Sequence, residues 1–188
     1  MPRPSDDHLA PLDTVDTAPV LHARPDELPW VLAELFRLGD SELFRRHFMR
    51  SVEFPSDDIT LFLAVNQLAM HGALRPTELA STLQTSRSNM SKIARKLDAL
   101  GLVALAPDPA DDRGVLLALT PQGRQLGERI IEGGRGILET MLQNWTPDDI
   151  AHFGALADRL VQSMKAILEP LSAPPESAEP RQRRAHSA

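Results

Sequence analysis

Residues 75–101 hold two short amphipathic segments separated by only a few residues. In the first, Pro76 suits the first helical position and Glu78 the third. The second runs from Ser86, a good N-cap residue, to Gly101, which suits the position after a helix end. Its apolar residues fall on one helical face: Met90, Ile93, Ala94, Leu97 and Leu100. Two short helices joined by a tight turn are predicted, which is a helix-turn-helix.

Two short apolar runs follow this pair of helices. Residues 102–106 read "LVALA" and residues 115–119 read "VLLAL", with a Pro/Asp/Gly loop between them. This pattern predicts a β-hairpin, in which Asp108 and Pro109 shape the turn. A helix-turn-helix followed by a hairpin is a winged helix, so the expected fold class is mainly α with a small α+β winged-helix domain.

The flanking regions are predicted to be helical. Apolar residues over 28–52 lie near helix spacing. Ser56 is expected to cap a helix over 57–71 that is apolar almost all round and therefore central. Thr120 and Pro121 open a long helix to about residue 144, and Thr146 caps a last one.

Three glycines interrupt that long helix in "EGGRG" at 132–136. Together they cost about 3 kcal/mol relative to alanine. We interpret the cluster as a break between two shorter helices. The alternatives are close helix approach at a dimer interface, or a hinge.

Composition limits the classes of protein that this chain can belong to. The 188 residues include no cysteine, which excludes disulfides and thiolate metal sites. No apolar run reaches the length of a membrane span, and the amino terminus has no signal-peptide pattern, so we expect a cytoplasmic protein. Residues 1–27 and 170–188 are rich in Pro and polar residues and are expected to be disordered.

The distribution of charge favours nucleic acid more than the net charge of −6 does. Residues 75–100 carry five basic residues against two acidic ones. The outward positions of the second short helix are Arg87, Ser88, Asn89, Ser91, Lys92 and Arg95. Arginine and asparagine can pair with guanine and adenine edges, and the later basic residues can meet phosphates. A plain solvated helix face is the alternative interpretation.

The run from Leu74 to Gly123 resembles the MarR family of bacterial winged helix-turn-helix regulators. The matching stretches are "LRPTELASTLQTSRSNMSKIARKLDALGLV" and "PDPADDRGVLLALTPQG". The wing motif of the family is met by Asp111, Arg113, Leu119, Thr120 and Gly123. The resemblance implies a DNA-binding domain over 57–120, with dimerisation helices over 28–56 and 121–169. It also implies a homodimer that represses transcription at a pseudo-palindromic operator and releases DNA when a small aromatic or anionic effector binds.

The resemblance and the helix pattern together define the candidate site residues. The expected DNA contacts are Arg75, Ser86, Arg87, Ser88, Asn89, Ser91, Lys92, Arg95 and Arg113. Arg113 is expected in the minor groove, and Asp111 is expected to support the wing. Candidates for an effector pocket are Phe36, Phe44, His47, Phe48, Phe62 and His71, although helical spacing indicates that most of them are simply core residues. We expect no metal site and no cofactor.

Three departures from the family pattern affect the expected DNA affinity. Residues 104–106 are apolar where basic residues are common, Asp112 replaces a usual arginine, and Arg75 stands where Ser or Thr usually caps a helix. Fewer phosphate contacts predict modest affinity with a shallow salt dependence. A winged-helix module that binds protein is therefore the alternative function. An enzyme is not expected, because no nucleophile–base arrangement or phosphate-binding glycine loop is present.

Overall fold

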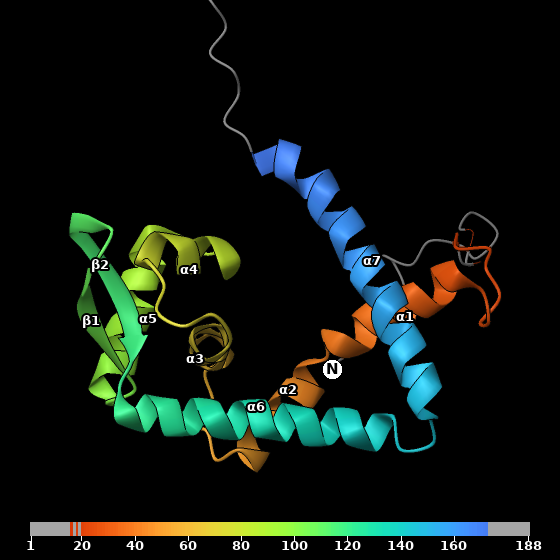
Figure 1. The fold of residues 1–188 in the computed structure, drawn as a ribbon, viewed down its shortest axis with the longest axis horizontal. Helices are drawn as coiled ribbons and strands as arrows, with labels where there is room; N and C mark the ends of the chain where they lie inside the picture. The colour runs from red at the N-terminus through yellow and green to blue at the C-terminus, as the bar shows by residue number, and fades with distance from the viewer. Residues whose placement is uncertain (1–15, 17, 19, 173–188) are drawn as a thin grey trace, which may run out of the picture. The chain divides into compact units, whose positions relative to one another are not determined.

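The computed structural model describes residues 16, 18 and 20–172. The elements of this part of the chain are shown in Figure 1. In chain order they are α1 (Leu28–Gly39), α2 (Glu42–Ser51), α3 (Ile59–His71), α4 (Pro76–Thr82), α5 (Arg87–Ala99), β1 (Val103–Asp108), β2 (Asp111–Leu119), α6 (Pro121–Met141) and α7 (Pro147–Ser172). Most of the segments expected to be disordered, 1–27 and 170–188, lies outside the described residues. Where the second one begins, the expectation was wrong, because α7 continues through residues 170–172.

The fold is the predicted winged helix-turn-helix. The helices α4 and α5 form the helix-turn-helix, and β1 pairs antiparallel with β2 from Val103↔Leu119 to Asp108↔Asp111. The strands extend further into the loop than predicted, which leaves only two residues at the tip. The chain divides into two compact units, one up to Gly134 and one from Arg135 onward. No helix in residues 20–172 is both long and apolar enough to cross a membrane.

The core of the first unit forms around α3, as its uniformly apolar sequence predicts. Figure 1 shows this helix end-on, above the horizontal α6. Its residues Ala64 and Val65 are completely buried. Around them pack buried side chains of α2, α4, α5, α6 and the hairpin: Met49, Leu79, Met90, Leu97, Leu117, Leu126 and Ile130. This core holds α5 and the wing in place, so the outward face of α5 is left to solvent.

Two predicted helices begin or break elsewhere than expected. The pattern over 28–52 forms two helices: α1 ends at Gly39, and Ser41 caps α2 by accepting a 3.4 Å hydrogen bond at its Oγ from the amide of Phe44. The helix expected from residue 57 begins at Ile59. Its N-cap is Asp58, whose carboxylate accepts a hydrogen bond from the amide of Thr60.

The predicted break at 132–136 was wrong, because α6 is a continuous helix from Pro121 to Met141. A Cβ added to Gly133 would lie 3.0 Å from both Phe48 Cε2 and Val52 Cγ1. This glycine therefore lets α6 pack closely against α2, which compensates for its poor helix propensity. Added Cβ atoms on Gly134 and Gly136 would meet nothing within 4 Å.

Candidate nucleic-acid interface

The helix α5 is built to present a polar face. Its N-cap, Ser86, accepts a 3.2 Å hydrogen bond from the amide of Asn89, as predicted. Met90, Ile93 and Leu97 are buried against the core. The six outward positions predicted to meet DNA, Arg87, Ser88, Asn89, Ser91, Lys92 and Arg95, are all exposed. The face that would meet a duplex is therefore separated cleanly from the face that packs.

Several side chains on this face are held by local hydrogen bonds. Asn89 Nδ2 donates to Thr85 Oγ1 at 2.8 Å, and Arg95 Nε donates to the carbonyl oxygen of Ser91 at 3.2 Å. Ser86 Oγ lies 3.1 Å from Ser88 Oγ. The bond from Asn89 Nδ2 fixes the side-chain amide near the start of the helix, where a recognition helix approaches base edges.

Lys96 has a structural partner that sequence reasoning missed. Its Nζ lies 3.0 Å from Oδ2 of Asp58, the N-cap of α3. Burial raises the pKa of the Asp58 carboxyl, but hydrogen bonds from Lys96 and the Thr60 amide outweigh burial and hold this pKa below its ordinary value. The pair links α5 to the central helix α3.

Two of the three aspartates in the wing loop, Asp108 and Asp111, accept hydrogen bonds from the backbone of the loop. Asp111 Oδ1 accepts a 3.0 Å hydrogen bond from the amide of Arg113, so the expected support of the wing is a backbone bond. Asp108 Oδ1 accepts one of 2.9 Å from the amide of Ala110, in the turn that it was predicted to shape. Arg113 itself is exposed.

Arg75, at the start of α4, is paired with a carboxylate of the wing. Its Nε donates a 2.6 Å hydrogen bond to Oδ2 of Asp108. Glu78, as predicted from its third helical position, accepts a 2.9 Å hydrogen bond from the amide of Arg75. The unusual cap residue is therefore explained by a partner on the wing, 33 residues further along the chain.

The six candidate pocket residues are not gathered in one place. Phe44 stacks on Phe48 at 6.5 Å between ring centroids, and Phe48 meets Phe62 edge-on at 5.8 Å. Phe36 on α1, His47 on α2 and His71 at the end of α3 are all exposed. The row joins α2 to α3, and Phe62 is a core residue.

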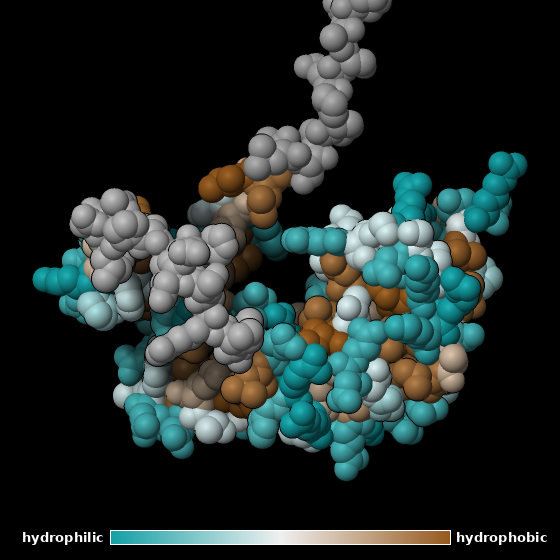
Figure 2. All heavy atoms as spheres, turned by 180° about the vertical axis from the view of Figure 1, so that it is seen from behind, coloured by the Kyte–Doolittle hydropathy of each residue, from teal (hydrophilic) through white to brown (hydrophobic). Residues whose placement is uncertain are grey.

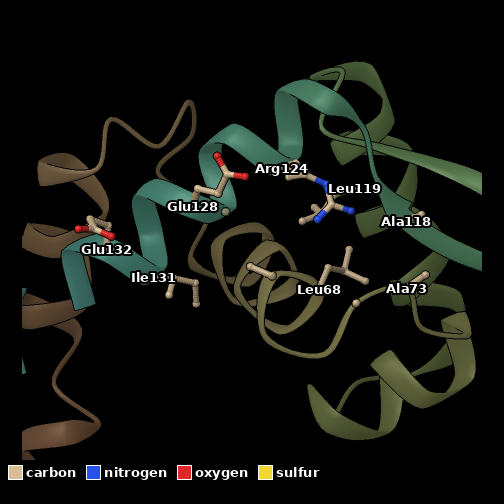
Figure 3. Close-up of a pocket in the computed structure, with 11 residues that line it drawn as sticks. Leu68, Ala73, Ala118, Leu119, Arg124, Glu128, Ile131 and Glu132 are labelled. Atoms are coloured by element: carbon tan, nitrogen blue, oxygen red, sulfur yellow. The ribbon is translucent and has the colours of Figure 1, made fainter. Parts of the chain in front are cut away.

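A pocket of about 320 Å³ lies elsewhere, where α3, the end of β2 and α6 meet. Its apolar lining includes Leu68, Leu119 and Ile131, and its basic lining residue is Arg124. In Figure 3 the guanidinium group of Arg124 points toward Leu119, whereas the carboxylate of Glu128 points to the other side of α6. The sequence offered no local signal for this pocket, because three separate elements build it.

Residues 20–172 contain no group of three or more His, Asp or Glu side chains placed to hold a metal ion. The polar clusters of this part of the chain instead serve helix caps, the wing turn and the α5 surface.

Comparisons with known proteins agree with this geometry. Residues 62–114 match the model of the MarR family. The chain is 33% identical over 117 residues to the HTH-type transcriptional repressor NicR of Pseudomonas putida, covering 61% of this chain and 74% of NicR. It is 31% identical over 99 residues to the uncharacterized HTH-type transcriptional regulator YxaD of Bacillus subtilis, covering 53% of this chain and 69% of YxaD.

Solved structures share the fold at low sequence identity. A MarR protein from Peptoclostridium difficile superposes with a TM-score of 0.60 at 16% identity, covering 84% of this chain and 100% of that one. A MarR family protein from Bacillus stearothermophilus gives 0.59 at 22% identity, covering 74% and 99%. The family model, the two relatives NicR and YxaD and the fold all agree. The chain therefore belongs to the MarR family of transcriptional regulators.

Proposed function

We propose that this protein is a repressor that binds a pseudo-palindromic operator as a homodimer, with α5 in the major groove and the wing over the minor groove. The polar face of α5 supports this proposal most strongly, because its outward side chains are exposed while Met90, Ile93 and Leu97 are buried behind them. Arg87, Ser88, Asn89 and Ser91 would meet base edges. Lys92 and Arg95 would meet phosphates.

The wing adds one further contact in this proposal. Arg113 is exposed beside a backbone that Asp111 holds in place. An arginine so placed suits a narrow, A·T-rich minor groove. Asp112 is also exposed and carries the opposite charge, so the wing contributes little net attraction.

Dimerisation is supported by apolar side chains that the single chain leaves exposed. On α7 these are Ile150, Phe153, Leu156, Leu160, Val161, Met164, Ile167 and Leu168. Figure 2 shows hydrophobic side chains at the surface toward the carboxyl end of this helix. On α1 the exposed set includes Leu28, Val31, Leu35 and Phe36. Patches of this kind mark protein interfaces, and a second copy would cover them.

We assign the effector to the pocket lined by Leu68, Leu119 and Arg124 rather than to the aromatic row of Phe44 and Phe48. The apolar walls suit an aromatic ring, and the guanidinium group directed toward Leu119 suits its carboxylate. Such a ligand would contact both the end of the wing strand and the start of α6. Arg124→Ala should abolish the response to a small aromatic acid without weakening operator binding; a response lost instead on Phe44→Ala would favour the row.

A second function, binding of a protein partner by the wing, is favoured by one observation. Leu105 is 64% exposed and Val115 is 46% exposed on the hairpin, where basic side chains would serve DNA better. Under either function we propose that the protein acts as a regulator in the cytoplasm and catalyses no reaction.

A footprint on DNA from around the protein's own gene tests the leading proposal. The expected result is protection of two half-sites, with centres about 10 base pairs or a multiple of this apart. Absence of any protected sequence, by a protein that is folded and dimeric in solution, would favour the protein-binding alternative.

A further inference from the structure

The contact between Arg75 and Asp108 joins two parts of the domain that have different roles. Arg75 stands at the start of α4, and Asp108 at the turn of the wing. Their side chains approach to 2.6 Å between Nε and Oδ2. The carboxylate side chain is only 5% exposed, whereas the arginine side chain is 41% exposed.

The carboxyl group of Asp108 is fully engaged. Its Oδ1 accepts from the amide of Ala110, and its Oδ2 accepts from Arg75. These two bonds hold the pKa of Asp108 below its ordinary value, so the group is charged at neutral pH. A buried carboxylate requires a fixed partner, and removing that partner would leave an uncompensated charge.

Neighbouring contacts reinforce the same junction. The residue before Arg75 is Leu74, which exchanges two backbone hydrogen bonds with Leu117 of β2, at 3.1 and 2.8 Å. A Cβ added to Gly114 would lie 2.9 Å from Cβ of Asp108, so the glycine makes room for the buried aspartate. The wing is thus attached to the start of α4 at its strand and at its turn.

We propose that Arg75 and Asp108 form a latch that sets the position of the wing relative to α5, and so places Arg113 for the minor groove. Arg75 is then a positioning residue and not a phosphate contact. The DNA-binding test of this inference rests on the proposed function. A second test, hydrogen exchange of the DNA-free protein, does not depend on that function.

The variant Asp108→Asn distinguishes a latch from a direct phosphate contact of Arg75, because the two roles predict opposite changes in DNA affinity. If Arg75 were a phosphate contact, the neutral variant would free it and remove a negative charge from the DNA side, so binding would tighten. With a latch, the wing loses its anchor and operator binding weakens by roughly tenfold, the scale of losing one groove contact. Asp112→Asn is the matched control, since it removes the same charge from the same loop and should tighten binding.

The effect of Arg113→Ala on DNA binding shows whether the Arg75–Asp108 pair positions Arg113 or only stabilises the fold. Arg113→Ala should weaken binding in the wild-type background and cost much less in the Asp108→Asn background, because the misplaced arginine no longer contributes. The double variant Arg75→Ala/Asp108→Asn should bind no worse than Arg75→Ala alone, since both changes break one interaction. Independent, additive effects of the three changes would overturn the latch.

Hydrogen exchange on the DNA-free dimer completes the test. Asp108→Asn should accelerate exchange of the wing amides over 110–116, whereas Asp112→Asn should not, with thermal unfolding confirming that both variants are folded. Equal exchange in the two variants overturns the latch even if the wild-type protein binds its operator. Failure of the wild-type protein to bind any operator would instead contradict the proposed function, and the exchange result would still decide the latch.

Discussion

The backbone of Gly123 packs against the carbonyl group of Leu102 so closely that a Cβ on Gly123 would lie 1.9 Å from the carbonyl oxygen. A side chain at this position would force backbone, and not the end of a flexible side chain, to shift. The same junction is tied by Thr120, whose Oγ1 donates a 2.6 Å hydrogen bond to the carbonyl oxygen of Gly101. The start of α6 and the end of the α5–β1 connection therefore form one rigid corner.

Gly123→Ala should consequently destabilise the protein by about 3 kcal/mol or more, through overpacking against backbone. Urea unfolding measures the loss. Gly134→Ala is the matched control in the same helix, because an added Cβ there meets nothing within 4 Å. It should raise stability by up to about 1 kcal/mol. Equal behaviour of the two variants would contradict the close packing at Leu102.

Gly133→Ala should show an intermediate cost. An added Cβ would lie 3.0 Å from Phe48 and Val52, so these two side chains must shift. We expect a net loss of about 1 kcal/mol, whereas Gly136→Ala, which meets nothing within 4 Å, should gain stability. Thermal unfolding of both variants checks this, and a change of effector response in Gly136→Ala would revive a hinge role for the glycine cluster.

Asp112→Arg should tighten DNA binding. The exposed aspartate sits beside Arg113 and opposes the phosphates, so an arginine adds a contact where the wild-type residue repels. The slope of log affinity against log salt should steepen by about one unit. Fluorescence anisotropy over a salt series measures the slope. An unchanged slope would mean that residue 112 points away from DNA.

Lys96→Ala should lower stability by about 0.5 kcal/mol at pH 7, the scale of an exposed ion pair, because it breaks the contact with Asp58. The pKa of Asp58 is lower in the folded state, so its stabilisation is complete above the unfolded pKa of about 3.9. It is lost as the pH falls through the folded pKa. Unfolding of both proteins from pH 7 downward should show the difference between them vanish in acid. Lys92→Ala, on the same helix, should show no such difference but should lower the salt slope by about one unit.

Local signals in the sequence predicted the parts of the structure that depend on neighbouring residues. The Ser86 cap, the helix end before Gly101 and the hairpin turn at Asp108 all follow from contacts within a few residues. The all-apolar helix α3 was recognisable as central for the same reason. These elements alone were enough to predict the winged helix.

Other features depend on residues that are distant in the sequence. The Arg75–Asp108 and Lys96–Asp58 pairs span 33 and 38 residues, and no local pattern reveals them. Arginine is an unusual N-cap residue, so Arg75 indicated an additional interaction at the start of α4. The sequence did not show that its partner is Asp108. The continuity of α6 through its glycines was missed because helix propensity was weighed without the packing of Gly133 on α2.

Whether α5 reads DNA sequence is tested most directly by the affinity of Arg87→Ala for operator and for scrambled DNA. Arg87 is exposed at the start of α5 and can pair with a guanine edge. A folded, dimeric variant should lose at least about tenfold in operator affinity while its affinity for scrambled DNA falls much less. If the variant still prefers the operator as strongly as the wild-type protein does, α5 does not read the sequence through Arg87, and the proposed recognition of the operator is contradicted.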